Sequence, residues 1–347
     1  MTSGADAMRA ACYVGERTLS IVETEPRSPG EGEVTIDVAY TGICGTDLHI
    51  LHGAMDSRVT LPAVLGHEMS GTIAAIGSAV EGWAVGERVT VMPLAPCGAC
   101  PACRGGHSHV CHNLDFLGID SPGSMQSRWT VPADVLVGLP AGLSLEHAAL
   151  AEPTAVAVHD VRRAGLVEGE RALVVGGGPI GVLVACAARA CGADVVVAEP
   201  SEPRRALAQA VGLRALDPNA ADVQALVSDW TDGAGVEVAF EVSGAVAGLE
   251  TAIQSLGVRG RIVVVAIHAT PPAVNLFRVF WRELTLIGAR VYERGDFEEA
   301  VRLLAAGAIP ASALITRIDP LDAVSAAFAE LESGRAMKVL IDCQAGG

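Results

Sequence analysis

The sequence is poor in positive charge, and lysine is almost absent from it. Its 347 residues include 24 lysines and arginines against 40 aspartates and glutamates, which gives a formal net charge of -16, and Lys338 is the only lysine. A surface with this excess of negative charge repels phosphate backbones and anionic lipids. We therefore expect neither a nucleic-acid partner nor a membrane partner.

The sequence also lacks the marks of exported and membrane-embedded chains. Its first residues, MTSGADAMRAACYV, have no basic start followed by an apolar run, so we expect a cytoplasmic protein. The longest uncharged run, residues 172–188, is interrupted by glycines and a proline where a membrane helix would be continuous. Disulfides are disfavoured in the cytosol, so the four of the nine cysteines that lie between Cys97 and Cys111 point to metal binding instead.

What is present is the composition of a folded protein with about two domains. Half of the residues are hydrophobic and 18% are charged. Up to residue 153, short β-branched runs between glycine and proline turns predict a largely β domain. In residues 154–291, apolar strands alternate with alanine-rich helical stretches, which predicts a parallel α/β layer. Residues 292–347 carry two amphipathic helices, each closed by a glycine, and a last strand.

Four cysteines gather in one short lobe, residues 97–111. Cys97, Cys100, Cys103 and Cys111 are separated by two, two and seven residues. Thiolates so close together can converge tetrahedrally on one ion, and four of them leave no coordination position for a substrate. The spacing lacks the further cysteine beside a proline that is usual in iron–sulfur proteins. We predict a structural zinc site.

A second set of metal-binding residue types lies at turns between β runs. Cys44 occurs in TGICGTDLH, and His67 and Glu68 occur in VLGHEMSG. A catalytic zinc takes three protein ligands, commonly cysteine, histidine and carboxylate, and keeps one position open. Each residue alone is better explained by core packing. Only the combination indicates a site.

The segment RALVVGGGPIGVL predicts a strand, a tight turn and a helix that together bind a dinucleotide. Its glycines follow the GxGxxG pattern, in which the backbone approaches a pyrophosphate at the helix N-terminus. The predicted cofactor-binding residues of this loop are Gly176, Gly178, Pro179, Ile180 and Gly181.

The next strand predicts which dinucleotide binds. It ends in Glu199, 18 residues beyond Gly181. A carboxylate there accepts hydrogen bonds from both ribose hydroxyls and repels a 2′-phosphate, so we predict NAD over NADP. Arg204 and Arg205 follow closely; they either soften this preference, with Arg204 as a cofactor contact, or are surface arginines of a helix.

Together, the GHE and CGTD segments, the cysteine lobe and GGGPIG make the sequence similar to the zinc-containing medium-chain dehydrogenase/reductase superfamily over essentially its whole length. The resemblance implies a GroES-like catalytic β domain (1–153) and a Rossmann NAD-binding domain with a doubly wound parallel sheet (154–291). It also implies a C-terminal segment (292–347) that returns to the catalytic domain. Two zinc ions per chain are implied, with the catalytic one in the cleft between the domains.

The resemblance also assigns the catalytic zinc ligands. Cys44 and His67 match two ligands of the superfamily, and Glu68 matches an adjacent glutamate that ligates directly or holds the metal from the second shell. The segment LAEPTAVAVHDVRRAG resembles sorbitol and (R,R)-butanediol dehydrogenases, which makes Glu152 the expected third ligand, directly or through water. A carboxylate favoured by the helix dipole is the alternative for Glu152. We interpret His159, in the same segment, as a packed histidine.

Four further residues acquire roles by resemblance. Thr46 and His49 match a hydroxyl and a histidine that carry the proton of the alcohol out of a closed site. Arg290, in GARVY, matches an arginine that borders the substrate in the polyol branch. Phe116 either lines the same pocket or packs in the core.

We therefore expect a zinc-dependent, NAD-linked oxidoreductase that interconverts a secondary alcohol and a ketone. A small diol or polyol, such as 2,3-butanediol with acetoin as its product, is the expected substrate. Ile50 and Leu51 replace aromatic residues of sorbitol dehydrogenases, which argues against sorbitol itself. We expect a homodimer or a homotetramer.

Two other functions stay open. One is a threonine dehydrogenase, or another alcohol or aldehyde dehydrogenase of the same superfamily. The other is a non-catalytic nucleotide-binding relic, but such a protein should have lost ligand residues, and this chain retains them.

Overall fold

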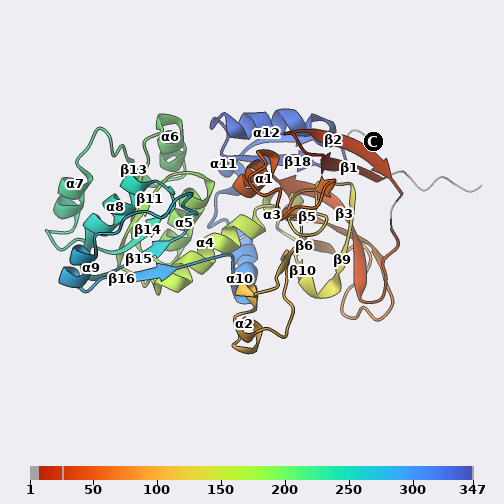
Figure 1. The fold of residues 1–347 in the computed structure, drawn as a ribbon, viewed down its shortest axis with the longest axis horizontal. Coiled ribbons are helices and arrows are strands. Elements are labelled where there is room, and N and C mark those ends of the chain that lie inside the picture. The colour runs from red at the N-terminus through yellow and green to blue at the C-terminus, as the bar shows by residue number, and fades with distance from the viewer. Residues whose placement is uncertain (1–7, 26, 346–347) are drawn as a thin grey trace, which may run out of the picture. The chain divides into compact units, whose positions relative to one another are not determined.

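The computed structural model describes residues 8–25 and 27–345, and the chain divides into two compact units (Figure 1). Unit 1 comprises Met1–Glu152 and Ile315–Gly347, and unit 2 comprises Pro153–Leu314. Within the described residues, no helix has both the length and the apolar character needed to cross a bilayer.

Unit 1 is built mainly of strands. One sheet has the order β2-β1-β4, a second runs β10-β6-β5-β3-β18-β17 with β9 paired to β3, and β7 pairs with β8. The elements before its first boundary are β1 (Met8–Tyr13), β2 (Leu19–Thr24), β3 (Glu33–Gly42), α1 (Gly45–Leu51), β4 (Ala63–Val64), β5 (Glu68–Ile76), β6 (Arg88–Val91), β7 (Leu94–Ala95), α2 (Pro101–Arg104), β8 (Asp115–Phe116), β9 (Arg128–Pro132), β10 (Leu136–Gly138) and α3 (Leu145–Ala148).

The end of the chain completes the large sheet of unit 1. β17 (Ile315–Pro320) and β18 (Lys338–Asp342) are parallel to each other, with α12 (Val324–Glu332) between them. β18 then pairs antiparallel with β3, so that Leu340 lies opposite Gly42. The last strand therefore lies beside the end of β3, from which the chain continues into Cys44.

Unit 2 contains one six-stranded parallel sheet with the order β13-β12-β11-β14-β15-β16. α4 (Ala151–Ala164) crosses into this unit, whose other elements are β11 (Arg171–Val175), α5 (Pro179–Ala190), β12 (Asp194–Ala198), α6 (Glu202–Ala210), β13 (Arg214–Leu216), α7 (Val223–Trp230), β14 (Val236–Glu241), α8 (Val246–Ser255), β15 (Leu256–Val264), α9 (Leu276–Arg282), β16 (Thr285–Gly288), α10 (Arg294–Ala305) and α11 (Ala311–Leu314). The strand order reverses between β11 and β14, and ligands of such sheets bind outside the carboxyl ends of the strands at this point.

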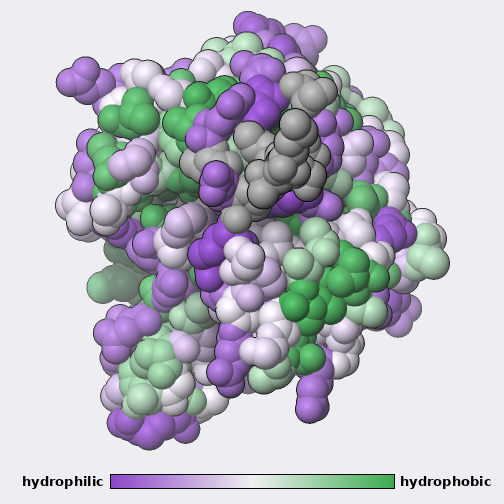
Figure 2. Space-filling view, turned by 90° about the vertical axis from the view of Figure 1, so that its right-hand side faces the viewer, coloured by the Kyte–Doolittle hydropathy of each residue, from purple (hydrophilic) through white to green (hydrophobic). Residues whose placement is uncertain are grey.

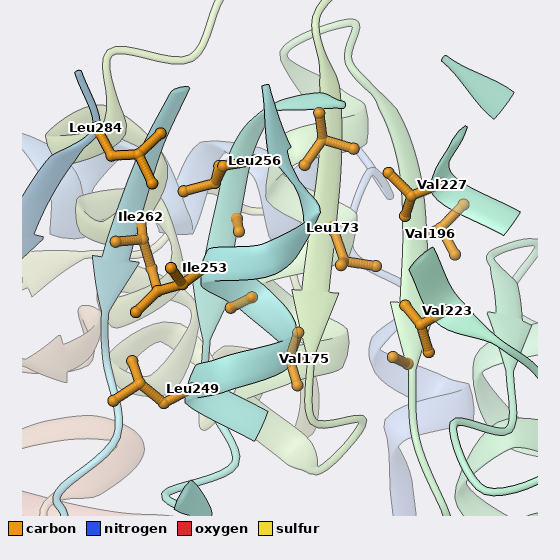
Figure 3. Close-up of a cluster of buried hydrophobic side chains, with 14 residues drawn as sticks. Leu173, Val175, Val196, Val223, Val227, Leu249, Ile253, Leu256, Ile262 and Leu284 are labelled. Atoms are coloured by element: carbon orange, nitrogen blue, oxygen red, sulfur yellow. The ribbon is translucent and has the colours of Figure 1, made fainter. Parts of the chain in front are cut away.

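A core of branched aliphatic side chains covers one face of this sheet. Leu173 and Val175 are two residues apart in β11 and so share a face. They pack in a cluster with Val227 of α7 and Leu249 and Ile253 of α8 (Figure 3). The near-continuous Val, Ile and Leu runs of the strands are those of a sheet buried on both faces.

The division of the chain differs from the prediction in residues 292–314. These were expected to return with the C-terminal segment, but α10 and α11 belong to unit 2. Phe297 and Ala300 of α10 are fully buried, and His159 Nδ1 lies 2.8 Å from Asp296 Oδ2, which identifies His159 as a packed histidine. Helical periodicity showed that α10 has an apolar face but could not show which core covers it.

Apolar side chains also reach the surface. One face of the molecule mixes hydrophilic and hydrophobic residues, with a hydrophobic group to the right of centre (Figure 2). The largest exposed side chains are concentrated on α9, where Leu276, Phe277, Phe280 and Trp281 are 68% to 74% exposed. The next element along the chain, β16, is an edge strand of the parallel sheet.

Candidate metal centres and cofactor site

The four cysteines of the 97–111 lobe converge in unit 1. Cys100 Sγ lies 3.5 Å from Cys103 Sγ and 3.7 Å from Cys111 Sγ, and Cys111 Sγ lies 3.4 Å from Cys97 Sγ. Four sulfurs bound tetrahedrally to zinc at about 2.3 Å would be separated by about 3.8 Å. The sulfur positions therefore fit one zinc ion.

Backbone N–H groups stabilise thiolates in this lobe. The N–H of Cys97 and that of Asn113 each donate to Cys111 Sγ at 3.3 Å. These two bonds lower the pKa of Cys111, but burial and the hydrogen bonds with the Cys97 and Cys103 thiols outweigh them and raise it to about 11. Donation from the N–H groups of Cys103 and His112 lowers the pKa of the Cys100 thiol to about 6. Metal binding requires the deprotonated form, so these hydrogen bonds prepare the lobe for a cation.

Cys44, His67 and Glu68 form the second converging group. Their ligand atoms lie within 4.8 Å of one another, and His67 and Glu68 are buried. Cys44 is the N-cap of α1, and Glu68 is the first residue of β5. Burial opposes a charge on His67, but Asp47, Cys44 and Glu152 together raise its pKa well above the usual value. This excess of negative groups fits a divalent cation.

Asp47 is a residue of this site that sequence reasoning missed. Its Oδ2 accepts the Cys44 N–H at 2.8 Å, and its Oδ1 lies 3.8 Å from His67 Nδ1. Both Asp47 Oδ1 and His67 Nδ1 are buried and lack a hydrogen-bond partner among the described residues. Asp47 therefore contacts the backbone of Cys44 and lies near the side chain of His67. Its position three residues after the N-cap of α1 was the signal available in the sequence.

The single lysine of the chain is the second residue missed. Lys338, at the start of β18, is buried; its Nζ donates to the Ile43 carbonyl at 3.1 Å and forms an ion pair with Glu68. A Cβ at Gly42 would overlap Glu68 Oε2 and touch Lys338 Cε, so the glycine leaves space for the pair in its present position. The sequence shows that Lys338 is the only lysine, but only the tertiary structure shows that it lies beside Glu68.

The other predicted residues of unit 1 lie around this group. Glu152 is buried and near enough to raise the pKa of His67, but it is not in the converging set. Thr46 is partly buried and His49 exposed on α1. Phe116 is buried, and its ring centroid lies 5.3 Å from that of His67, edge to face.

Ile50 and Leu51, which had argued against sorbitol, are buried in the core of unit 1. Their apolar character is explained by packing.

In unit 2, the glycine loop lies between β11 and α5. Gly176 has φ +108°, and a Cβ there would lie 2.9 Å from Ser243 N. A Cβ at Gly181 would overlap the Gly176 carbonyl, and Gly178 is the N-cap of α5. Pro179 and Ile180 begin this helix, whose first N–H groups and dipole favour an anion.

Glu199 lies against this loop. It is buried directly after β12; Oε2 accepts the Gly177 N–H at 2.6 Å and Oε1 accepts the Ser201 N–H at 2.7 Å. Arg205 is held by Asp217 at 3.2 Å. Arg204 Nη1 lies 3.9 Å from the position of a Cβ on Gly178, at the N-terminus of α5.

Arg290 lies just after β16 in unit 2 and is exposed. Among the described residues it has no hydrogen bond or ion pair. The metal-binding groups and Phe116 all belong to unit 1.

Comparison with known protein families assigns a domain family to each unit. Residues 30–141 match the alcohol dehydrogenase GroES-like domain, and residues 179–306 match the zinc-binding dehydrogenase domain. The chain is 49% identical to 2-dehydro-3-deoxy-L-galactonate 5-dehydrogenase of Pseudoalteromonas atlantica, covering 97% of this chain and 99% of that one. It is 37% identical to L-threonine 3-dehydrogenase of Pyrococcus horikoshii, covering 92% and 94%.

Solved structures agree with this fold. A zinc-binding dehydrogenase of Sinorhizobium meliloti bound to NADP has a TM-score of 0.92 at 30% identity, covering 97% of this chain and 99% of that one. The 2R,3R-butanediol dehydrogenase of Bacillus subtilis has a TM-score of 0.89 at 32% identity, covering 96% and 99%.

Substitutions should separate the two metal groups. We expect Cys103→Ser to lose one zinc ion and to lower the melting temperature, because metal binding in a closed site contributes to folding. We expect His67→Ala to lose the other zinc ion, to remain folded, and to lose roughly 10³-fold or more in kcat/KM. Elemental analysis, thermal unfolding and a dehydrogenase assay measure these effects.

Cys191→Ser is the matched control, because Cys191 is a free, exposed thiol outside both groups. It should keep two zinc ions and full stability. A stable, inactive Cys103 variant together with a fully active His67 variant would show that the two roles are reversed.

Proposed function

This chain belongs to the zinc-binding alcohol and polyol dehydrogenase family, and we propose that it oxidises one secondary hydroxyl of a sugar acid to a ketone, with NAD as the hydride acceptor and two zinc ions per chain. The observation that carries the reaction type is the buried Cys44–His67–Glu68 group.

Cys44 and His67 would hold the catalytic zinc, with Glu68 or Glu152 completing the ligand set. Zinc in such a site lowers the pKa of an alcohol and favours the alkoxide. Asp47 accepts the N–H of Cys44 and so fixes the N-cap geometry, and its second carboxylate oxygen places negative charge 3.8 Å from His67 Nδ1. Lys338 neutralises Glu68, so that this carboxylate is held beside the site without an unpaired buried charge.

The proton of the alcohol needs a path to solvent. Thr46 and His49 lie three residues apart on α1, on one face of the helix. Thr46 is partly buried and His49 is exposed, so the pair leads from the interior to the surface. We assign the Thr46 hydroxyl to relay the proton, giving up its own proton towards His49 as it accepts that of the substrate, and His49 to release a proton to solvent.

Support for a sugar acid comes from the relative that is 49% identical over nearly the whole of both chains. Its substrate, by name, is a polyhydroxylated carboxylate. Arg290 is an exposed arginine without an ion-pair partner among the described residues, and its guanidinium suits a substrate carboxylate. A small diol such as 2,3-butanediol, and L-threonine, are the competing substrates.

A spectrophotometric screen of NAD reduction tests this assignment. We expect kcat/KM for 2-dehydro-3-deoxy-L-galactonate to exceed that for (R,R)-2,3-butanediol, sorbitol and L-threonine by roughly tenfold or more, because a carboxylate–arginine contact contributes about 1.5–3 kcal/mol. His67→Ala is the inactive control. A higher kcat/KM for butanediol or threonine would reject the sugar-acid assignment and leave the family reaction in place.

We also propose that Glu199 makes NAD the preferred cofactor. It lies at the end of β12 beside the glycine loop, where the ribose hydroxyls bind in folds of this type. The related Sinorhizobium meliloti structure is bound to NADP, so family membership alone does not decide the cofactor. In this chain Glu199 and Arg204 both lie beside the glycine loop. The carboxylate would repel a 2′-phosphate, whereas the guanidinium would attract it.

Glu199→Ala should raise KM for NAD roughly tenfold or more and should raise the ratio of NADP to NAD efficiency, since two hydroxyl contacts and one repulsive charge are lost. Steady-state kinetics with both cofactors measure this ratio. Glu202→Ala, an exposed glutamate of α6 three residues on, is the control. An unchanged ratio in the Glu199 variant would show that this carboxylate does not bind the ribose.

We further propose a homodimer formed by β16 and α9. Among the described residues β16 pairs only with β15, and its open edge can pair antiparallel with β16 of a second copy. The exposed, stacked rings of Phe277 and Trp281, with centroids 5.7 Å apart, lie on the helix that precedes this edge. A dimer with one two-fold axis would then pair the open edge of β16 and bury the exposed rings of α9.

Trp281→Asp should weaken this dimer, because it places a charge in an apolar interface. Light scattering after size exclusion should show a shift to the monomer mass at micromolar concentration. Val85→Asp replaces an equally exposed apolar residue of unit 1 and should leave the dimer intact. Identical masses for both variants and the unmodified protein would contradict this interface.

A further inference from the structure

A small cavity of about 130 Å³ opens at the edge of the unit 2 sheet opposite to the glycine loop. It lies at the amino ends of β14 and β15, where the loop of residues 233–235 and Leu256 line it. The glycine loop follows the carboxyl end of β11, which is parallel to β14. The cavity is therefore separate from the cofactor site.

Two arginines one helical turn apart on α9 face this cavity, Arg278 and Arg282. The Nε atoms of both are buried and have no hydrogen-bond partner among the described residues. Arg278 Nη2 donates to the carbonyls of Gln254 and Leu256, at 2.7 and 3.2 Å, which fixes its guanidinium. Arg282 makes no hydrogen bond or ion pair within the described chain.

No carboxylate lines the cavity among the described residues, although the chain is strongly acidic. Burial, and then the charge of Arg282, lower the pKa of Arg278, so the two cations repel each other without compensation. Glu283, the next residue along the chain, is paired with Arg259 at 3.0 Å. Other arginines of the sheet have acidic partners, such as Arg171 with Glu237 at 2.8 Å.

We propose that this cavity is a binding site for a small oxyanion of the phosphate class. The guanidinium groups of Arg278 and Arg282, which line the cavity, would donate to its oxygens, as guanidinium groups do to phosphate. Ser228 and Gln224 add polar groups to the wall.

The volume and the lining residues of the cavity indicate the kind of ligand that it can hold. Val227 and Leu256 form an apolar floor that belongs to the core cluster (Figure 3). The cavity has room for a phosphate-sized group. The site rests on neither the zinc ligands nor the proposed reaction.

Isothermal titration of the zinc-loaded protein with inorganic phosphate, at constant ionic strength, tests the proposal. We expect saturable binding of one phosphate per chain that is unchanged by saturating NADH, which occupies the pyrophosphate-binding loop. Arg282→Gln should weaken phosphate roughly tenfold or more, since it removes a charge-assisted contact. Arg189→Gln, which changes an exposed arginine of the same unit that does not line the cavity, should not. A parallel titration with glycerol 3-phosphate distinguishes free phosphate from a phosphate monoester as the tighter ligand.

Three results would overturn the site. Phosphate binding that is abolished by NADH would place the ion in the cofactor loop. Equal affinity in the Arg282 variant and the unmodified protein, or no saturable binding, would show that the arginines do not hold an anion. A dimer that dissociates on Arg282→Gln without any phosphate binding would assign the cavity to a carboxylate of a second copy. Light scattering on the same samples gives the mass of the protein and so detects this dissociation.

Discussion

The ion pair between Lys338 and Glu68 is the interaction on which the arrangement of unit 1 depends. It lies at the end of β3, where β5 begins on one side and β18 on the other, and Gly42 leaves the space for it. A buried carboxylate without a partner is costly, so Glu68 can stand beside Cys44 and His67 only if a cation is delivered to it. The strand that delivers it comes from the last ten residues of the chain.

This arrangement has a consequence for how the site is assembled. Cys44, Asp47, His67 and Glu68 are close in the sequence, but Lys338 reaches them only after the chain has passed through the whole of unit 2 and returned. The buried charge of Glu68 is therefore paired only when β18 has paired with β3. Folding of unit 1 and formation of the site are thus coupled through one strand pairing.

In unit 2, the two ends of the parallel strands differ in the charged groups beside them; we call these ends the carboxyl edge and the amino edge of the sheet. At the carboxyl edge, the glycine loop and the N-terminus of α5 favour a pyrophosphate, and the carboxylate of Glu199 accepts a backbone N–H of this loop. At the amino edge, Arg278 and Arg282 form a cationic cavity in a strongly acidic chain. Because all six strands run in the same direction, the two edges are physically separate.

The sequence by itself determined the features that depend on short spacing. Cys97 to Cys111 and the Gly176–Gly181 loop were predicted because a few intervening residues leave the chain few ways to place the ligand atoms. The fold class followed from periodicity and from a family resemblance, and the family matches confirm it. Only the tertiary structure decided that Glu68 and not Glu152 joins the converging group, that Asp47 and Lys338 support it, and that residues 292–314 belong to unit 2. The reason is physical: these relations are long-range pairings of buried charges and apolar faces, and a local pattern shows that a side chain must be covered or neutralised without showing by what.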